Sequence, residues 1–416
     1  MSGSGIDLSS ANARLAAAGL TATTILLLTA GLSMLQPLST DLYLSTLPGI
    51  ATYFNASVAS VQSTLWMFIA AFGVWQLVAG PLSDRFGRYP IVVAGAFTYC
   101  AASVLAMFAP SLEVLITGRI LQAVGACTCL IGARGFVRDL YSPTEGARMI
   151  ANAATIMSLA PLIGPLIGAT LYVQYGWRSS FAVLAAFSLL LACLAAFKLR
   201  ETNTRRNPNA LTLAPMLRTY ASVVRSPAFR AYTLSAAATY ACLFAFLSGS
   251  SFVFINVLGQ TPTTFALSFA TMVVGYLIGT VICRRLLAIY GIQRTVCAGA
   301  SLQAAAGLAM ATLAVIGIHV PLAIGVPMFF IGVSHGLIQP PVQSGAVAPF
   351  PHAAGAASAL LGFVMMLVAT CVGIWIGASY DGTVYPLTLT ICACGLASAA
   401  IAFTLVRKDG DLGPIS

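Results

Sequence analysis

The sequence predicts an all-α integral membrane protein whose twelve transmembrane helices form two six-helix bundles. Hydrophobic residues make up 59% of the chain and charged residues only 7%, whereas a soluble domain carries about 25% charged residues. The apolar stretches have the length of membrane-spanning helices, and they lack the alternating pattern of a membrane β-barrel. The longest polar segment, residues 200–227, leaves six apolar stretches on each side of it.

Each apolar stretch is predicted to cross the membrane once. The run that follows Leu20 is too long for the core of a signal peptide, so we expect it to be the first span. The predicted spans are 20–48, 59–82, 90–109, 112–137, 147–175, 178–199, 228–258, 264–287, 294–317, 320–345, 353–380 and 384–406.

The chain is expected to consist of an N-terminal bundle (1–199), a cytoplasmic linker (200–227) and a C-terminal bundle (228–416). An even number of spans puts both termini on one side of the membrane. If that side is the cytoplasm, eighteen of the twenty Lys and Arg residues lie on cytoplasmic segments or at the inner ends of spans, as the positive-inside rule requires. The net charge of +10 is therefore a topology signal. Because it is spread over separate loops, we expect no nucleic-acid partner. The linker arginines are Arg200, Arg205, Arg206, Arg218 and Arg225.

The two halves of the chain resemble each other. The segment GPLSDRFGRYPIVV (80–93) follows the second span, and GTVICRRLLAIYGIQRTV (279–296) follows the eighth with similar glycines and paired basic residues. Parallel repeats of six spans are typical of transporters, whose substrate site lies between the halves near the middle of the membrane.

Several motifs resemble those of the major facilitator superfamily. They are GPLSDRFGR (80–88), RILQAVGA (119–126) and APLIGPLIGA (160–169), and two further segments, PLSTDLYLSTLP (37–48) and VRDLYSP (137–143), are similar to the bicyclomycin/chloramphenicol resistance subfamily (Bcr/CflA). The resemblance implies the twelve-helix fold and proton-coupled efflux of lipophilic drugs such as chloramphenicol, florfenicol or bicyclomycin by alternating access. It also implies a monomer in the bacterial inner membrane, with both termini cytoplasmic, a small-molecule drug and the lipid bilayer as partners, and no cofactor beyond the proton gradient.

Asp41 is the first candidate for the coupling site, because it lies in the first apolar stretch. A carboxylate within a span costs about 2.5–3.5 kcal/mol on insertion scales and usually marks a proton, ion or substrate path. Asp41 lies ~30 Å along the first helix and Arg119 lies ~10 Å into a helix that enters from the outside. These depths are comparable, so we expect the two charges to pair, with Arg119 tuning a proton-carrying Asp41. The alternative is that Asp41 is a helix-end residue at the outer interface.

Further polar and aromatic side chains are candidates for substrate binding. Ser33 and Gln36 share the first span with Asp41, and Ser33 replaces a second acid found in some related antiporters, which argues against export of dications. On the tenth span, His335, Gln339 and Gln343 recur every four residues and so share one face, which should line a cavity or form interhelical hydrogen bonds. An aromatic wall for a drug, or else ordinary packed or lipid-facing aromatics, is expected around the seventh span at Tyr232, Tyr240, Phe244, Phe252 and Asn256.

The loop motif is expected to act as a conformational latch. The resemblance implies that Asp84 faces the start of the eleventh helix and that Arg88 reaches Asp139, with Arg85 nearby. Gly80 and Gly87 would permit close helix approach and a tight turn. The alternative is a set of ordinary solvated loop charges.

The fifth span carries the segment GPLIG (164–168), which resembles the antiporter motif. Its prolines should kink the helix, and its glycines should let it approach a neighbour and seal the protein against proton leak. The residues concerned are Pro161, Gly164, Pro165 and Gly168.

Two other functions compete with drug export. A transporter of a physiological metabolite could use the same fold. An enzyme is not expected, because the sequence has no His/Glu/Asp cluster with metal-ligand spacing and no nucleophile–base pair. The ten cysteines lack zinc-site spacing, so no metal is expected.

Overall fold

The computed structural model describes residues 20–203 and 206–410, and every regular element among them is a helix. The predicted all-α membrane fold is thus confirmed. The segment before Leu20 and the linker residue Arg205 lie outside the described residues.

The first half of the chain contains the helices that precede the linker. Several begin at a hydroxyl residue: Thr21 accepts a hydrogen bond from the backbone N–H of Thr24, and Ser142 forms a capping box with Glu145. Such caps satisfy backbone groups that helix ends leave unpaired. The helices are α2 (Ala22–Leu44), α3 (Leu47–Phe54), α4 (Val58–Phe86), α5 (Arg88–Met107), α6 (Leu112–Leu140), α7 (Pro143–Met157), α8 (Leu159–Tyr175) and α9 (Arg178–Lys198).

The second half begins after a short helix within the linker, α10 (Leu213–Arg225), which the sequence analysis did not foresee. Two of the later spans end in π-helical turns, η1 (Val253–Val257) and η3 (Ala402–Val406). The remaining elements are α11 (Pro227–Phe252), α12 (Pro262–Val315), α13 (Pro321–Val347), η2 (Pro351–Ala353), α14 (Ala354–Ser379), α15 (Tyr385–Ile401) and α16 (Arg407–Asp409).

The number of membrane crossings agrees with the prediction of twelve. Eleven helical stretches among the described residues are long and apolar enough to cross a membrane. One of them, α12, has 54 residues and would measure ~80 Å if straight, far more than the ~30 Å hydrocarbon core. It turns at Gly291, whose φ of 73° favours glycine. Helix α12 therefore contains the predicted eighth and ninth spans.

The fifth span is interrupted directly before Pro161, one of the two prolines expected to kink it. Helix α7 ends and α8 begins on either side of Ser158. Pro161, in the first turn of α8, has no N–H to continue the α7 ladder, which accounts for the break. Pro165 lies inside α8 without interrupting it.

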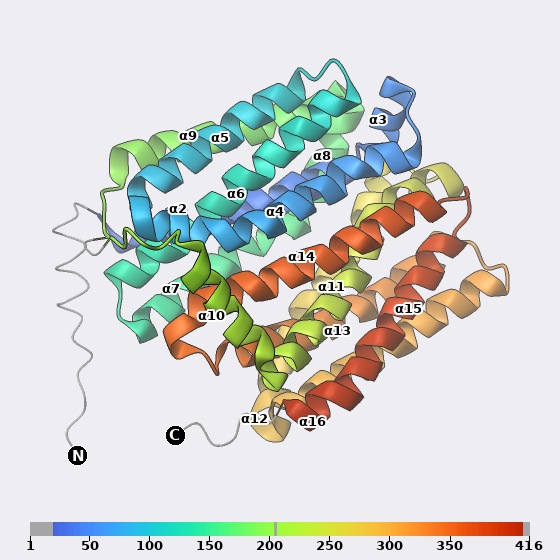
Figure 1. Ribbon diagram of the computed structural model, residues 1–416. Coiled ribbons are helices and arrows are strands. Elements are labelled where there is room, and N and C mark those ends of the chain that lie inside the picture. The colour runs from blue at the N-terminus through green and yellow to red at the C-terminus, as the bar shows by residue number, and fades with distance from the viewer. Residues whose placement is uncertain (1–19, 204–205, 411–416) are drawn as a thin grey trace.

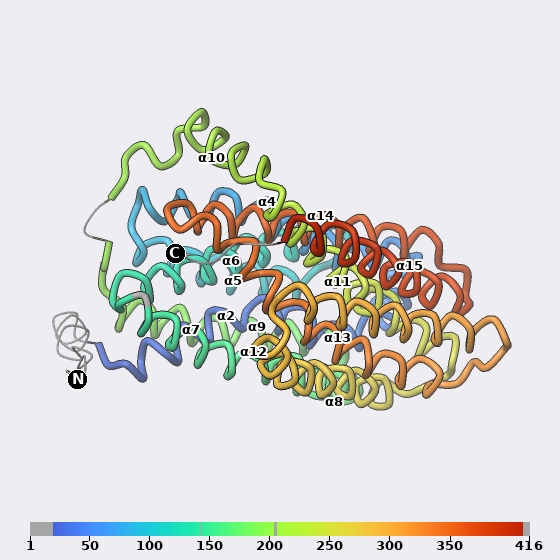
Figure 2. Tube along the Cα trace, turned by 90° about the horizontal axis from the view of Figure 1, so that it is seen from below, coloured from blue at the N-terminus to red at the C-terminus, as the bar shows by residue number. Residues whose placement is uncertain are grey.

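The spans form two groups that lie side by side (Figure 1). We call the end of the bundle that carries α10 the linker end, and the opposite end the α3 end; Figure 2 shows α10 on the outside of the bundle. The halves meet along α4 and α14, where added Cβ atoms at Gly73 and Gly373 would lie 2.6 Å from Met366 and 2.9 Å from Trp66. Toward the α3 end, Gln62 donates a 2.9 Å hydrogen bond to the Ser248 carbonyl.

Helices α2 and α8 pack closely because the facing residues are glycines. An added Cβ at Gly164 would lie 3.0 Å from Cβ of Asp41, and one at Gly168 would overlap the Leu42 carbonyl oxygen. Ser45 also donates a 3.4 Å hydrogen bond to the Pro165 carbonyl across this seam. Small residues allow such close approach in membranes, where no hydrophobic force drives helices together.

We expect Gly168→Ala to destabilise the protein, because the new methyl group would meet backbone atoms of α2 that cannot rotate away. Overpacking of this kind costs about 1–3 kcal/mol, so the midpoint of thermal unfolding in detergent should fall by several degrees. The matched control is Gly325→Ala on α13, where an added Cβ meets no atom within 4 Å. Equal midpoints for the two variants would show that the α2–α8 seam does not need a glycine.

Candidate functional site

Asp41 lies within the membrane-spanning part of α2 and is only 3% exposed. The Thr40 hydroxyl lies 3.1 Å from Asp41 Oδ1 and 2.8 Å from the Pro37 carbonyl oxygen, so it can donate to one of them at a time. No cation among the described residues forms an ion pair with Asp41. The Asp41 carboxyl group is therefore a buried acid without a fixed counter-ion, which is costly when ionised and cheap when protonated.

Asp41 also stands between the two halves of the protein. Gly164 of α8 contacts it from the same half. Tyr240 of α11, in the opposite half, is close enough to interact with it electrostatically. A change in the charge of Asp41 would therefore be felt by both halves.

The predicted pair between Arg119 and Asp41 is not formed. Arg119 is fully buried, and its Nε and Nη1 atoms donate hydrogen bonds to the Thr64 carbonyl (3.2 Å) and to Gln122 (2.9 Å). The physical reason is the position of the residues around α2. Tyr43, not Asp41, faces Arg119, and two residues along a helix are separated by about 200°.

Aromatic rings complete the surroundings of Arg119. Its guanidinium carbon lies 4.8 Å from the ring centre of Tyr43 and 4.4 Å from that of Phe68. Cation–π contacts gain strength where water is excluded. Gln122 in turn donates to Ser103 over 2.7 Å, so this one guanidinium connects α2, α4 and α6, and through Gln122 also α5.

The predicted polar stripe on α13 is present and partly connected. Gln343 donates to Gln339 over 3.0 Å, and Gln339 donates to the Ala236 carbonyl over 3.2 Å. His335 Nδ1 lies 3.5 Å from the Thr239 hydroxyl. The stripe thus makes the interhelical hydrogen bonds that were one of its two expected roles, while Gln343 stays exposed.

Aromatic rings surround His335 from two helices. The ring centres of Tyr240 and Tyr276 lie 6.5 Å and 5.7 Å from it, and Tyr240 stacks on the buried Phe244 at 6.4 Å. Tyr276 on α12 was not among the predicted residues, since an isolated tyrosine in an apolar run carries no sequence signal. Together these side chains form a partly aromatic and partly polar surface.

Some predicted site residues lie away from this surface. Asn256 is exposed in η1 at the α3 end, where it contacts Tyr380, because sixteen residues of helix place it ~24 Å from Tyr240. Tyr232 donates to the Gly410 carbonyl at the linker end, and Phe252 packs on Tyr380. Ser33 is buried and Gln36 half-buried on α2.

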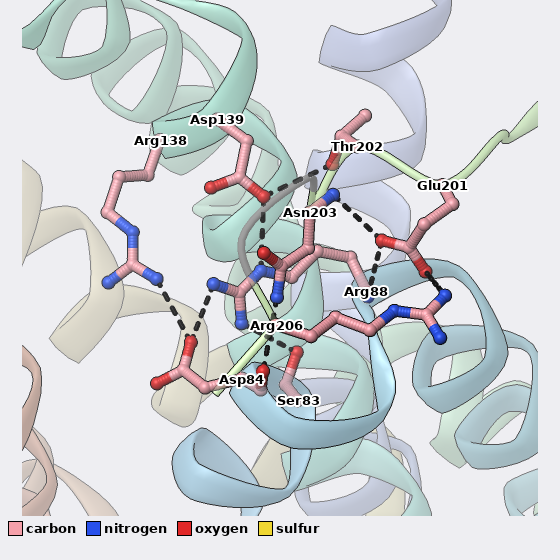
Figure 3. A network of polar contacts seen from close by, with 9 residues as sticks. All are labelled: Ser83, Asp84, Arg88, Arg138, Asp139, Glu201, Thr202, Asn203 and Arg206. Atoms are coloured by element: carbon pink, nitrogen blue, oxygen red, sulfur yellow. Dashed lines mark hydrogen bonds and ion pairs between the residues drawn. The ribbon is translucent and has the colours of Figure 1, made fainter. Parts of the chain in front are cut away.

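The loop between α4 and α5 forms a charged network at the linker end, with Arg88 at its centre (Figure 3). Arg88 lies 2.6 Å from Asp84 and 3.1 Å from Asp139, and it donates to Ser83 over 3.0 Å. The predicted contact between Arg88 and Asp139 is present. The Arg88 side chain is only 5% exposed, so ordinary solvated loop charges do not describe it.

The Asp84 carboxylate, which was expected to face the start of the eleventh helix, has two arginine partners in the described residues. It pairs with Arg88 and, over 3.4 Å, with Arg138 on α6. Two arginines offer a carboxylate more than the partial charge of a helix end.

The other residues of the loop motif have different surroundings. Gly87 has a φ of 108° and faces the Glu201 carboxylate, so the predicted tight turn needs glycine. An added Cβ at Gly80 would meet no atom within 4 Å, so the expected close approach at that position is wrong. Arg85 is exposed, lies 5.4 Å from the Phe86 ring centre and takes no part in the network.

The first residues of the linker join this network, which the sequence analysis missed. Glu201 accepts hydrogen bonds from the backbone N–H groups of Arg88 (3.0 Å) and Asn203 (2.8 Å). Thr202 donates to Asp139 over 3.2 Å. Asn203 and the backbone N–H of Asn207 both donate to the Asp84 carbonyl. The scarcity of acids in the chain was the available signal for Glu201.

The sequence matches the model of the Major Facilitator Superfamily over residues 29–374. Among curated proteins, it is 27% identical to a bicyclomycin resistance protein homolog of Haemophilus influenzae, over 93% of this chain and 97% of that protein. It is 28% identical to a chloramphenicol resistance protein of Pseudomonas aeruginosa, over 90% of each.

The fold is also similar to solved structures. A D-xylose–proton symporter superposes with a TM-score of 0.69 at 16% identity, over 93% of this chain and 98% of the other. A bacterial homolog of the human lysosomal transporter Spinster, in an inward-facing and occupied conformation, gives 0.69 at 14% identity, over 92% and 97%. The likeness at these identities concerns the fold. Fold, helix count and family match together assign the chain to the Major Facilitator Superfamily, as a multi-pass membrane transporter and not an enzyme.

Proposed function

We propose that the protein is a proton-coupled exporter of lipophilic drugs such as chloramphenicol, florfenicol or bicyclomycin. The observation that carries the proposal is the buried Asp41 without a counter-ion, placed between Gly164 of its own half and Tyr240 of the other. The names of the two drug-resistance relatives support the substrate class. The alternative, transport of a physiological metabolite, would use the same fold.

The linker end is proposed to face the cytoplasm of a bacterium, with the transporter as a monomer in the inner membrane. Arg88, Arg138 and the linker residue Arg206 lie at that end (Figure 3), and Arg85 lies in the last turn of α4. The positive-inside rule assigns such an end to the cytoplasm. The α3 end would then be the outer face.

The coupling is proposed to work by alternate occupancy of Asp41. A protonated Asp41 is neutral and can stay buried between the halves. An ionised Asp41 needs water, a polar partner or substrate, and therefore favours a state that exposes it. Arg119 does not pair with Asp41, so its proposed role is to hold α2 in place and not to serve as the counter-ion.

The substrate surface is proposed to comprise Gln36, Tyr240, Phe244, His335, Gln339 and Gln343. These residues combine aromatic area with a few polar groups, as small-molecule sites do. Tyr276 extends this surface next to His335.

Drug export can be tested in a drug-sensitive bacterial host that lacks its major efflux pumps. Expression should raise tolerance to at least one of chloramphenicol, florfenicol and bicyclomycin. The control is the Asp41→Asn variant at equal membrane abundance. Unchanged tolerance to all three compounds, with the protein present in the membrane, would contradict the proposed substrate class.

The coupling role of Asp41 predicts that Asp41→Asn abolishes drug-driven proton movement, because an amide cannot release a proton. The measurement uses everted vesicles with an imposed pH gradient and a fluorescent pH indicator. Asp41→Glu should retain part of the signal, and Asp381→Asn, at an exposed acid of the α3 end, should retain all of it. Proton movement at the wild-type rate in Asp41→Asn would place the carrier elsewhere, with His335 the next candidate.

The network around Arg88 predicts a separation between binding and transport. Asp84→Asn, Arg88→Ala and Glu201→Gln remove interactions of one conformational state, and a change of ~1.4 kcal/mol between two states alters their ratio about tenfold. Transport should slow while the purified variants still bind drug. Arg85→Ala, outside the network, is the control and should transport at close to the wild-type rate. Loss of drug binding in a well-folded variant would show that the network shapes the binding site itself.

A further inference from the structure

Arg134 is an arginine within a membrane span that neither the loop network nor the Arg119 cluster uses. It lies on α6, six residues before that helix ends at Leu140, which is ~9 Å from the linker end. Its side chain is exposed, yet protein surrounds it and removes much of its solvent. Exposure combined with shielding by protein is what we expect of a side chain on the wall of an internal opening, and not of one that faces lipid.

The angular position of Arg134 around the axis of α6 indicates the direction of this opening. Gly118, Gly125 and Gly132 lie against α5, where added Cβ atoms would meet Ala106, Gly95 and Val92. Arg134 follows Gly132 by two residues and is therefore turned by about 200° from the face that packs on α5. The Arg134 side chain therefore points away from α5 and toward the other half of the protein.

The other half offers neutral polar groups at this level. Helix α13 is largely buried, but Gln343 and Ser344 near its linker end are exposed, and α6 does not pack extensively on α13. No carboxylate of the described residues pairs with Arg134. By contrast Arg138, one turn further along α6, pairs with Asp84.

Arg134 and Asp41 thus lie at different depths from the linker end. Asp41 lies nineteen residues into α2 from its start at Ala22, ~28 Å from the linker end, whereas Arg134 lies ~9 Å from it. Once past the salt-bridged acids of the linker-end network, a molecule that enters from that end meets the unpaired guanidinium of Arg134 well before it meets the carboxyl group of Asp41. Guanidinium binds carboxylates in a bidentate manner and disfavours cations.

We propose that Arg134 is a substrate-recognition residue at the linker-end entrance, and that it selects amphiphiles bearing a single carboxylate over their cationic counterparts. The inference rests on the proposed export function and narrows its substrate class. Neutral drugs pass this residue without a charge penalty, and cationic ones meet electrostatic repulsion.

The test compares two compounds that differ in one charged group, chloramphenicol and its hemisuccinate ester, with tetraphenylphosphonium as the cation. Equilibrium binding to the purified full-length protein is measured for the wild type, Arg134→Gln, Arg134→Lys and the control Arg218→Gln on the surface helix α10. The wild type should bind the hemisuccinate more tightly than chloramphenicol. Arg134→Gln should weaken hemisuccinate binding about tenfold or more, the scale of a charge-assisted hydrogen bond, and leave chloramphenicol binding within twofold.

Arg134→Lys keeps the charge and should retain part of the preference, and Arg218→Gln should retain all of it. Tetraphenylphosphonium should bind Arg134→Gln more tightly than the wild type. An unchanged ratio between the two chloramphenicol compounds in a folded Arg134→Gln variant overturns the inference. So does the failure of the wild type to bind the hemisuccinate.

The drug-tolerance assay separates this result from the proposed function. Tolerance to neutral drugs without a charge preference leaves the export function standing and rejects the role of Arg134. A charge preference that depends on Arg134, without tolerance to any neutral drug, supports the entrance assignment and rejects export of neutral drugs.

Discussion

A guanidinium inside the membrane has to be compensated by something other than water, and the way this protein compensates Arg119 determines much of its first half. Two aromatic rings, a backbone carbonyl and a glutamine amide surround the charge. These groups come from α2, α4 and α6, so a single buried cation fixes three helices relative to one another. Because neutral groups serve Arg119, no carboxylate is needed for it, and Asp41 on the other side of α2 is left without a cation.

On the face of α2 that points away from Arg119, close packing against α8 holds the helix in place. Gly164 and Gly168 bring α8 against the backbone at Asp41 and Leu42. Similar glycine contacts, at Gly73 and Gly373, join α4 to α14 across the two halves. Because α2 is packed on both faces, it cannot shift by itself when the charge of Asp41 changes. The response has to be a rigid-body movement of several helices together.

The sequence was sufficient for the fold and for the identity of many site residues, but not for their mutual directions. Apolar runs of about twenty residues locate membrane spans because the bilayer imposes their length, but the same pattern does not reveal the short helix α10 in the linker. The depth of Asp41 and Arg119 was estimated along the helix axis, which leaves the angle around the axis undetermined. That angle places Tyr43 against Arg119.

The contacts of Glu201 were unpredictable for a different reason. Its partner Arg88 lies 113 residues away in the sequence, and no periodic pattern connects a loop residue to a helix start at that distance. The same holds for Tyr276 beside His335. Pairings between helices that are distant in sequence are set by the assembled bundle and not by local preference.

The attachment of the linker changes how the two halves are tethered. Residues 200–227 look like a long flexible chain, for which the entropic cost of bringing its ends together would be substantial. In the structure, Asn203 and Asn207 bind the Asp84 carbonyl, and Tyr220 of α10 donates to the Leu77 carbonyl over 2.9 Å. The stretch of chain between Tyr220 and the start of α11 at Pro227 has an anchor on α4 only at its Tyr220 end. Because this segment is short, the second half remains at high effective concentration beside the first. The linker therefore limits how far the two halves can separate.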